Sequence, residues 1–147
     1  MASTLLPLPK AQGCPLRSAR ERLRGLGMRP THQRVMLAWL LFGTGDRHVS
    51  AEQLHEEARR ARIPVSLATV YNTLHVFARE GLVREIAGVG QRSWFDTNTG
   101  EHAHFLDEDT GELVDAEGEL TIGALPEAPA GYEIAGCDVI VRLRRTR

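Results

Sequence analysis

The sequence predicts an α+β protein in two parts, a helical N-terminal domain closed by a β-hairpin and a small α/β domain after it. Two observations support this division. The apolar periodicity changes from about 3.6 residues before Gly81 to about two residues after it. Residues 1–98 contain 14 Arg and Lys against 8 Asp and Glu, whereas residues 99–147 contain 4 against 11. A basic part suits a polyanion and an acidic part suits cations, so we expect the two parts to have different roles.

Length and composition limit the class of protein. The 147 residues are 42% hydrophobic and 25% charged, which is enough for one globular domain or two small ones. No apolar run approaches the ~20 residues of a membrane span, and the start lacks the order of a signal peptide. We therefore expect a cytoplasmic protein with no membrane partner. The two cysteines, Cys14 and Cys137, lie far apart and provide no four-cysteine structural zinc site, so any metal must be bound by His and carboxylates.

Residues 1–15 contain three prolines and no periodicity, which predicts a flexible tail. The tail ends in Cys14-Pro15. A thiolate followed by proline can ligate ferric haem, because proline turns the chain aside and leaves the sulfur open. Taken alone, a Cys-Pro dipeptide in a tail is more often an accident of composition.

Three helices are expected next. Residues 16–26 predict a short basic helix suited to phosphate contact. The second helix begins after Thr31, a good N-cap, and ends at Gly43. Arg29 lies in the extended segment before it, where such an arm can enter a narrow A/T-rich minor groove. A capping box at its start predicts the third helix over residues 50–62.

The most informative stretch is residues 66–81, which predicts a helix with two different faces. Its inner face is apolar. Its outer face carries small and hydrogen-bonding residues where Lys and Glu are usual: Ala68, Thr69, Asn72, Thr73, Val76 and Arg79. Asn72 can bond bidentately to adenine and the Thr69 methyl can meet a thymine methyl, which suggests a DNA recognition helix. An ordinary packed helix with a quiet surface explains this segment equally well.

The neighbouring segments favour DNA recognition. A turn at residues 63–65 before this helix makes a helix-turn-helix. Residues 82–86 and 92–96 alternate like strands and are joined by a glycine-rich connection, so they predict the hairpin of a winged helix. Arg84 and Arg92 of this hairpin are expected near backbone phosphates. Residues 16–98 are therefore predicted to form a winged helix-turn-helix domain.

The acidic residues 99–147 contain His102-Ala103-His104. In a strand the two rings point to one face about 6.5–7 Å apart, within reach of one metal or one haem edge. Asp115, in a second strand after the turn at Gly111, could join them. On spacing alone, a surface histidine pair is as good an explanation as a ligand pair.

Two further elements complete this part. Residues 117–125 are predicted to form a short helix and residues 131–143 a strand. A small sheet with one helix has too little core to stand alone, which predicts a homodimer. In a homodimer, two recognition helices about 34 Å apart would read an inverted repeat in double-stranded DNA.

From residue 23 onward the chain resembles the ferric uptake regulator (Fur) family. The resemblance rests on the segments GMRPTHQRV, HVSAEQL, SLATVYNTL and GLVREI and on the histidine segment, in family-like order and spacing. Other segments are similar to the iron-response regulator (Irr) branch, which answers to haem: AWLLFG, GDRHVSAE, VSLATVYNTLHVF, FDTNT and DVIVRLRR.

The resemblance implies the roles of particular residues. Its regulatory metal site corresponds to His48, His102, His104 and Asp115. Its DNA-contacting positions correspond to Arg29, Thr69, Tyr71 and Asn72, of which Tyr71 would meet thymine methyls. Because some Irr members carry a Cys-Pro haem motif near the N-terminus, the implied haem ligands are Cys14, His102 and His104.

The sequence departs from the family pattern at three places. The carboxylate usual in the connection from wing to sheet falls on Val89, so the regulatory metal site is expected to lack one ligand. Asp107 and Thr110 stand where many Fur proteins have the first Cys-x-x-Cys of a structural zinc site. Ala103 replaces the middle one of three consecutive histidines common in Irr proteins, so we expect weaker haem binding.

Together these features predict a dimeric haem- or iron-responsive transcriptional regulator of A/T-rich inverted-repeat operators in iron and haem metabolism genes. A haem-delivering enzyme is a further partner that this function would imply. The alternative is a Fur-like repressor that responds to Fe, Mn or Zn instead of haem. An enzyme is not expected, because the histidine pair lacks the surroundings of a hydrolytic metal site. A haem carrier without DNA binding conflicts with the polar outer face of residues 66–81.

Overall fold

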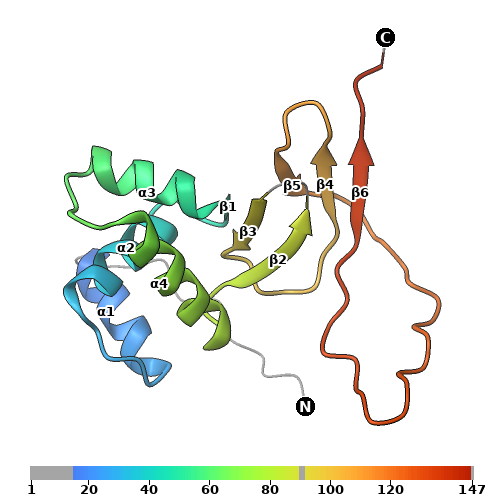
Figure 1. Ribbon diagram of the computed structural model, residues 1–147, viewed down its shortest axis with the longest axis horizontal. Helices are drawn as coiled ribbons and strands as arrows, with labels where there is room; N and C mark the ends of the chain where they lie inside the picture. Colours follow the sequence, from blue (N-terminus) through green and yellow to red (C-terminus); the bar gives the residue numbers. More distant parts are fainter. Residues whose placement is uncertain (1–14, 90–91, 147) are drawn as a thin grey trace.

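The computed structural model describes residues 15–89 and 92–146. Figure 1 shows the helices gathered on one side of the molecule and the strands on the other. The predicted tail, with Cys14, lies outside the described residues except for Pro15, which begins the first helix. Among the described residues, no helix has the length and apolarity needed to cross a membrane.

The N-terminal part contains the predicted helices, bounded by the predicted caps. They are α1 (Pro15–Gly25), α2 (His32–Phe42), α3 (Ala51–Arg60) and α4 (Leu67–Arg79). Thr31 accepts a hydrogen bond from the Arg34 amide at the start of α2, and Ser66 accepts one from the Thr69 amide at the start of α4. Ser50 and Gln53 form the reciprocal capping box of α3. These bonds satisfy amides that a helix start leaves free, so the helix boundaries follow from local sequence.

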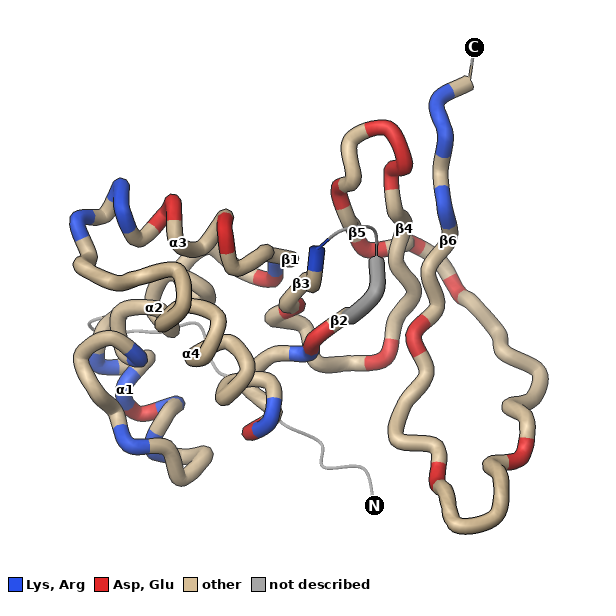
Figure 2. Tube along the Cα trace, viewed as in Figure 1, with Lys and Arg blue, Asp and Glu red and all other residues tan. Residues whose placement is uncertain are grey.

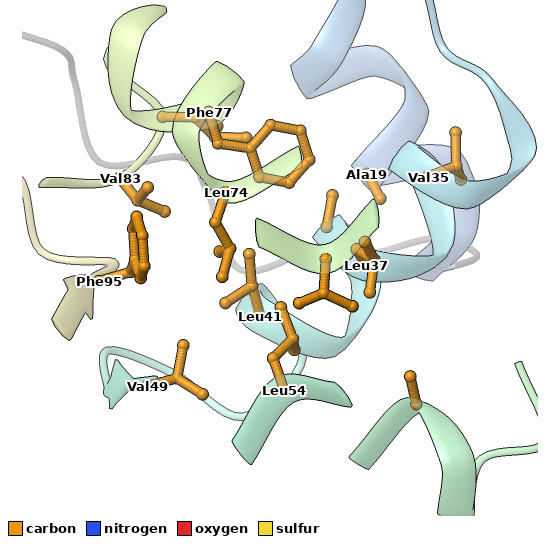
Figure 3. Packing of buried hydrophobic residues seen from close by; sticks show 14 of the residues in the cluster. Ala19, Val35, Leu37, Leu41, Val49, Leu54, Leu74, Phe77, Val83 and Phe95 are labelled. Atoms are coloured by element: carbon orange, nitrogen blue, oxygen red, sulfur yellow. The ribbon is translucent and has the colours of Figure 1, made fainter. Parts of the chain in front are cut away.

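The helices enclose one large apolar core. Its side chains come from all four helices, from the residues after α4 and from Phe95 (Figure 3). Leu37, Leu54, Leu74 and Phe77 are completely buried in it. Gly81, at φ 78°, ends α4 and turns the chain so that Leu82 and Val83 enter the same core. α4 is thus fixed from behind by apolar packing.

A hairpin follows α4, as predicted for a wing. It is formed by β2 (Arg84–Val89) and β3 (Arg92–Asp96), and the short strand β1 (His48–Val49) pairs with the other edge of β3. All these pairs are antiparallel, with His48 and Arg84 both opposite Asp96. A winged helix-turn-helix arrangement is therefore confirmed.

A second sheet forms the C-terminal part, with strand order β5-β4-β6. It contains β4 (His104–Asp107), antiparallel to β5 (Leu113–Asp115) and parallel to β6 (Ile140–Leu143). A small apolar cluster joins the two sheets: Ile86 and Trp94 from the first, Leu106 and Leu113 from the second, with Ile140 packed against them.

Two predicted elements of the C-terminal part are wrong. Residues 117–125 form no helix, and the strand predicted over residues 131–143 is limited to Ile140–Leu143. Leu120, Ile122 and Leu125 are exposed, so a helix here would have no core to pack on. Short helices need such packing, because their nucleation is unfavourable. The segment between β5 and β6 instead extends away from the sheet (Figure 1).

Candidate metal centre and nucleic-acid interface

Five potential ligands meet where the two sheets approach one another: His48, Asp96, His102, His104 and Asp115. Strand pairing explains the meeting, since His48 lies opposite Asp96 in the first sheet and His104 lies opposite Asp115 in the second. The fold brings together all four residues predicted as ligands and adds Asp96, at the end of β3.

The spacing of the donor atoms suits a single cation. One donor from each of the five side chains lies within 4.8 Å of all the others. The Nε2 atoms of His48, His102 and His104 lie 3.1, 2.9 and 3.1 Å from Asp96 Oδ2. The same nitrogens lie 3.1, 2.8 and 3.7 Å from Asp115 Oδ1. Ligands roughly 2.1 Å from an ion stand about 3 Å apart when they bind at right angles, which is close to this spacing.

Burial makes the cluster costly without a cation. The Asp96 and His104 side chains are 1% and 0% exposed, whereas Asp115 is 45% exposed. Nε2 of His48 and of His102 is buried and lacks a correctly directed hydrogen bond from or to any described residue. Buried polar atoms are normally paired, so unpaired nitrogens aimed at carboxylates fit a site that accepts a metal ion.

The ionisation of the cluster reflects its burial and its mixed charges. Burial lowers the pKa of His48, but the interaction with Asp96 and the charge of Asp115 outweigh it and leave the pKa raised. Burial and the neighbouring imidazoles lower the pKa of His104 despite its bond to Asp96. Burial raises the pKa of Asp96, but its interactions with His48 and His104 and the bond from the Asn98 amide prevail and hold the pKa below the ordinary value. These shifts favour the carboxylate of Asp96 and the neutral imidazole of His104, the forms that bind metals, whereas a cation would have to displace a proton from His48.

Backbone contacts orient the ligands. The Gly100 carbonyl lies 2.9 Å from His102 Nδ1 and can only accept, so Nδ1 carries the proton and Nε2 offers its lone pair to the cluster. The Asn98 amide donates to Asp96 Oδ1 at 2.8 Å, which leaves Oδ2 to face the histidines. This support around the donors is typical of metal sites.

The donor set indicates which cations fit. Three imidazoles and two carboxylates, with no thiolate, suit Fe²⁺, Mn²⁺ or Zn²⁺ better than Cu⁺. No donor is missing, which corrects the expectation based on Val89: the carboxylate comes from Asp96. The sequence offered one weak signal, because Asp96 directly follows the large apolar residues Trp94 and Phe95, and a carboxylate buried beside them requires a partner.

Three of the four predicted DNA-contacting residues, Arg29, Thr69 and Asn72, lie at or beside one hollow of the helical part. Asn72 is exposed and Thr69 half-buried on α4, beside a hollow of about 130 Å³ that Arg34 also lines. Arg34 donates to the Arg29 carbonyl at 3.1 Å, which fixes the arm before α2 next to this hollow. The outer face differs from the prediction at Thr73, which is buried because it packs toward α2 at the floor of the hollow.

Two polar residues near this face have intramolecular partners. The Tyr71 hydroxyl donates to Glu52 on α3 at 2.6 Å, and its half-buried ring packs against the helical core and stacks on His75. Arg84 does not extend toward a phosphate as predicted, because its guanidinium bonds Asp138 and two carbonyls within the chain. Arg92 of the wing remains exposed.

Charge is distributed as the sequence predicts. In Figure 2, basic residues lie along α1 and at the end of α3, and acidic residues crowd the turn between β4 and β5. The outer face of α4 carries little charge between these regions. Arg34 places a positive charge at the hollow itself, a pattern that suits a phosphate beside a base-reading surface.

Of the three predicted haem ligands, the structure describes His102 and His104, whose ring centroids lie 4.4 Å apart. Cys14 lies outside the described residues. His102 and His104 both point into the five-residue cluster, where their Nε2 atoms face Asp96 and Asp115. Neither ring presents that nitrogen to a large planar ligand while the cluster is intact.

Comparison with known proteins gives matches of sequence and fold. Residues 25–141 match the model of the ferric uptake regulator family. The chain is 37% identical over 102 residues to the peroxide operon regulator of Bacillus subtilis, covering 68% of each protein. It is 35% identical over 93 residues to the peroxide-responsive repressor PerR of Staphylococcus aureus, covering 63% of this chain and 62% of that protein.

Solved structures show the same fold. The ferric uptake regulator of Pseudomonas aeruginosa with manganese matches with a TM-score of 0.63 and 26% identity, over 86% of this chain and 97% of that one. The Vibrio cholerae ferric uptake regulator matches with a TM-score of 0.64 and 19% identity, over 86% and 98%.

Proposed function

Because this chain belongs to the ferric uptake regulator family of transcriptional regulators, we propose that it binds operator DNA as a homodimer under the control of one divalent cation per chain. The observation that carries the proposal is the convergence of three imidazoles and two carboxylates from both sheets. The homologues are regulators and not enzymes, which supports the expectation that the chain has no catalytic role.

The positions of the ligands suggest how metal binding would control DNA binding. His48 and Asp96 belong to the sheet attached to the DNA-reading helices, whereas His104 and Asp115 belong to the second sheet. A bound cation would supply the positive charge that holds these groups together. The side chains would then fix one angle between the sheets. DNA affinity changes only to the extent that this angle suits the operator better than others do.

Homodimer formation is supported by the surface of the C-terminal part. The strand β6 lies at an edge of its sheet, and its Val141 and Leu143 are exposed. Leu120, Ile122, Leu125, Tyr132 and Ile134 are exposed on the preceding segment. Apolar groups next to an open strand edge suit burial against a second copy, which would set the distance between two recognition helices.

The ligand set supports metal regulation more strongly than haem regulation. Mn²⁺ and Fe²⁺ accept mixed imidazole and carboxylate ligands, and the P. aeruginosa relative is described with manganese. A haem response would require His102 and His104 to leave the cluster, or Cys14 to act alone. Membership of the iron-response regulator branch and a haem-delivering partner therefore remain predictions from sequence resemblance.

A peroxide response is a second candidate function. The B. subtilis and S. aureus relatives are named for it. The side-chain set of this chain accepts Fe²⁺, which peroxide oxidises, as readily as Mn²⁺, which is far less reactive toward it. If this function is correct, peroxide releases DNA from protein loaded with Fe²⁺ and leaves the Mn²⁺ form bound. Equal behaviour of the two forms would contradict it.

The proposal is tested by fluorescence anisotropy of labelled A/T-rich inverted-repeat duplexes at fixed salt. Purified protein is titrated without metal, with Mn²⁺, with Mn²⁺ followed by chelator, and with ferric haem. We expect Mn²⁺ to tighten binding, chelator to reverse the effect, and a duplex with a single half-site to bind more weakly. If DNA binding is equal in all metal conditions, metal control is wrong. If haem alone alters it, the haem-responsive alternative is correct.

A further inference from the structure

Arg84 lies at the junction of the DNA-reading and C-terminal parts. It is the first residue of β2, three residues after the glycine that ends α4. In the sheet its backbone lies directly opposite Asp96, one of the five cluster residues. A displacement of Asp96 is therefore transmitted to Arg84, and through a short covalent path to the recognition helix.

The Arg84 side chain reaches across the junction to two separate segments. Its Nη1 donates to the Gly100 carbonyl at 3.3 Å. Its Nη2 donates to the Cys137 carbonyl at 3.0 Å and to Asp138 Oδ1 at 2.5 Å. The side chain is only 21% exposed, which reduces the solvent screening of its ion pair with Asp138.

Both contacted segments support cluster residues. The Gly100 carbonyl that accepts from Arg84 also accepts from His102 Nδ1 at 2.9 Å. The segment bonded through Cys137 and Asp138 continues to Val139, whose carbonyl accepts from the His104 amide at 3.0 Å. Arg84 thus shares the Gly100 carbonyl with His102, and it bonds the residue next to Val139, which holds His104. Its backbone also lies opposite Asp96 in the sheet.

The chemistry of arginine suits this role. A guanidinium presents several donors in a fixed plane, so a single side chain can hold two carbonyls and a carboxylate. Lysine carries the same charge at one point and does not reproduce this geometry.

We propose that Arg84 is a positioning residue that couples the metal cluster to the recognition helix. The inference rests on the proposed metal control and assigns its transmission to one side chain. With Arg84 bonded to Gly100 and Asp138, the segment before β4 and the start of β6 move together with β2. Without these bonds, the cluster can close around a cation while β2 and α4 keep the range of orientations that they have in the metal-free protein.

The test compares Arg84→Ala, Arg84→Lys and Asp138→Ala with a matched control, Arg144→Ala. Arg144 also has an ion pair, to Glu108 at 2.6 Å, but its side chain is 83% exposed and this bond goes to the turn after β4. For each variant, DNA affinity is measured by anisotropy with and without Mn²⁺, and the ratio of the two affinities is the coupling factor. We expect this factor to fall about fivefold or more in Arg84→Ala. Arg84→Lys and Asp138→Ala should show smaller losses, and Arg144→Ala should match the wild type.

A second measurement needs no metal. Amide hydrogen exchange of the metal-free variants should show faster exchange at Gly100 and His104 in Arg84→Ala, with unchanged rates in α4. If wild-type coupling exists but Arg84→Ala retains it, this inference is overturned and the proposed function stands. If DNA affinity of the wild type is the same with and without Mn²⁺, the proposed metal control is wrong, and the inference about Arg84 falls with it. Should Arg84→Ala not fold, unchanged coupling in Asp138→Ala overturns the inference.

Discussion

The helical part and the C-terminal part of this molecule are stabilised in different ways. The first has a continuous apolar core that includes Phe77, Leu74 and Leu54. The second shares one small cluster with the wing and leaves residues such as Tyr132 and Ile134 exposed. Its His102, His104 and Asp115 belong instead to the five-residue cluster that could hold a metal ion. We therefore expect the helical part to be stable by itself and the C-terminal part to depend on ligand and partner for its order.

The first prediction concerns the apolar core of the helical part, where we expect the greatest change. Phe77→Ala empties the centre of the helical core and should lower the free energy of unfolding by about 3–5 kcal/mol. Leu113→Ala, in the small cluster, should leave the helical part folded. Chemical denaturation followed by circular dichroism measures both. If Leu113→Ala unfolds the helices as thoroughly as Phe77→Ala does, the stability of the helical part depends on the C-terminal part.

The next effect concerns the sensing side. His104→Ala removes a completely buried donor and should weaken Mn²⁺ binding by at least about 100-fold, because even changes beside a metal ligand cost 10–100-fold. The rise in melting temperature that Mn²⁺ causes should disappear as well. His75→Ala is the matched control, since His75 pairs with Glu85 outside the cluster. Equal Mn²⁺ affinity in both variants, measured by calorimetry, would exclude this site.

A smaller effect tests the DNA-reading side. Asn72→Ala should weaken binding to a preferred duplex by about 1–3 kcal/mol, the usual discrimination of one bidentate base contact. Mn²⁺ affinity in the absence of DNA should not change. Glu119→Gln, on the exposed segment after β5, is the control for a distant substitution. If Asn72→Ala keeps the DNA affinity and base preference of the wild type, Asn72 makes no base contact.

The smallest effect is the pH dependence of metal binding. The pKa of His48 is raised above 6.5, so below that raised pKa a cation must displace its proton. The pKa of His104 is lowered, so this ring loses its proton at a lower pH than His48 does and contributes less to the dependence. The logarithm of Mn²⁺ affinity should therefore fall with decreasing pH below the His48 pKa, by about one unit per pH unit for each displaced proton. Affinity that stays constant from pH 8 to 6 would contradict this ionisation.

Sequence reasoning performed best where local signals are strong. Caps at Thr31, Ser50 and Ser66 define helix starts, and the change of periodicity after Gly81 indicates the wing. Such features depend on neighbours within a few residues, which the sequence shows directly. Resemblance to the family then selected His48, His102, His104 and Asp115, which spacing alone could not bring together.

The rest depended on contacts distant in sequence. Asp96 joined the cluster through its pairing with His48, a register that no local pattern specifies. Arg84 turned inward because Asp138, more than fifty residues later, lies beside it. The helix predicted over residues 117–125 failed because its apolar residues find no core in a single chain. The metal, DNA and haem assignments and the domain limits at residues 15, 98 and 147 remain predictions.

Metal control, as proposed, requires that a cation at the five-residue cluster and DNA at α4 stabilise the same arrangement of the molecule. The most direct test is the Mn²⁺ dissociation constant, from the electron paramagnetic resonance signal of free Mn²⁺, with and without a duplex selected for tight binding. Linkage requires DNA to tighten Mn²⁺ binding by the same factor as Mn²⁺ tightens DNA binding. Equal factors above one are the predicted result. A Mn²⁺ affinity that DNA leaves unchanged would contradict the account.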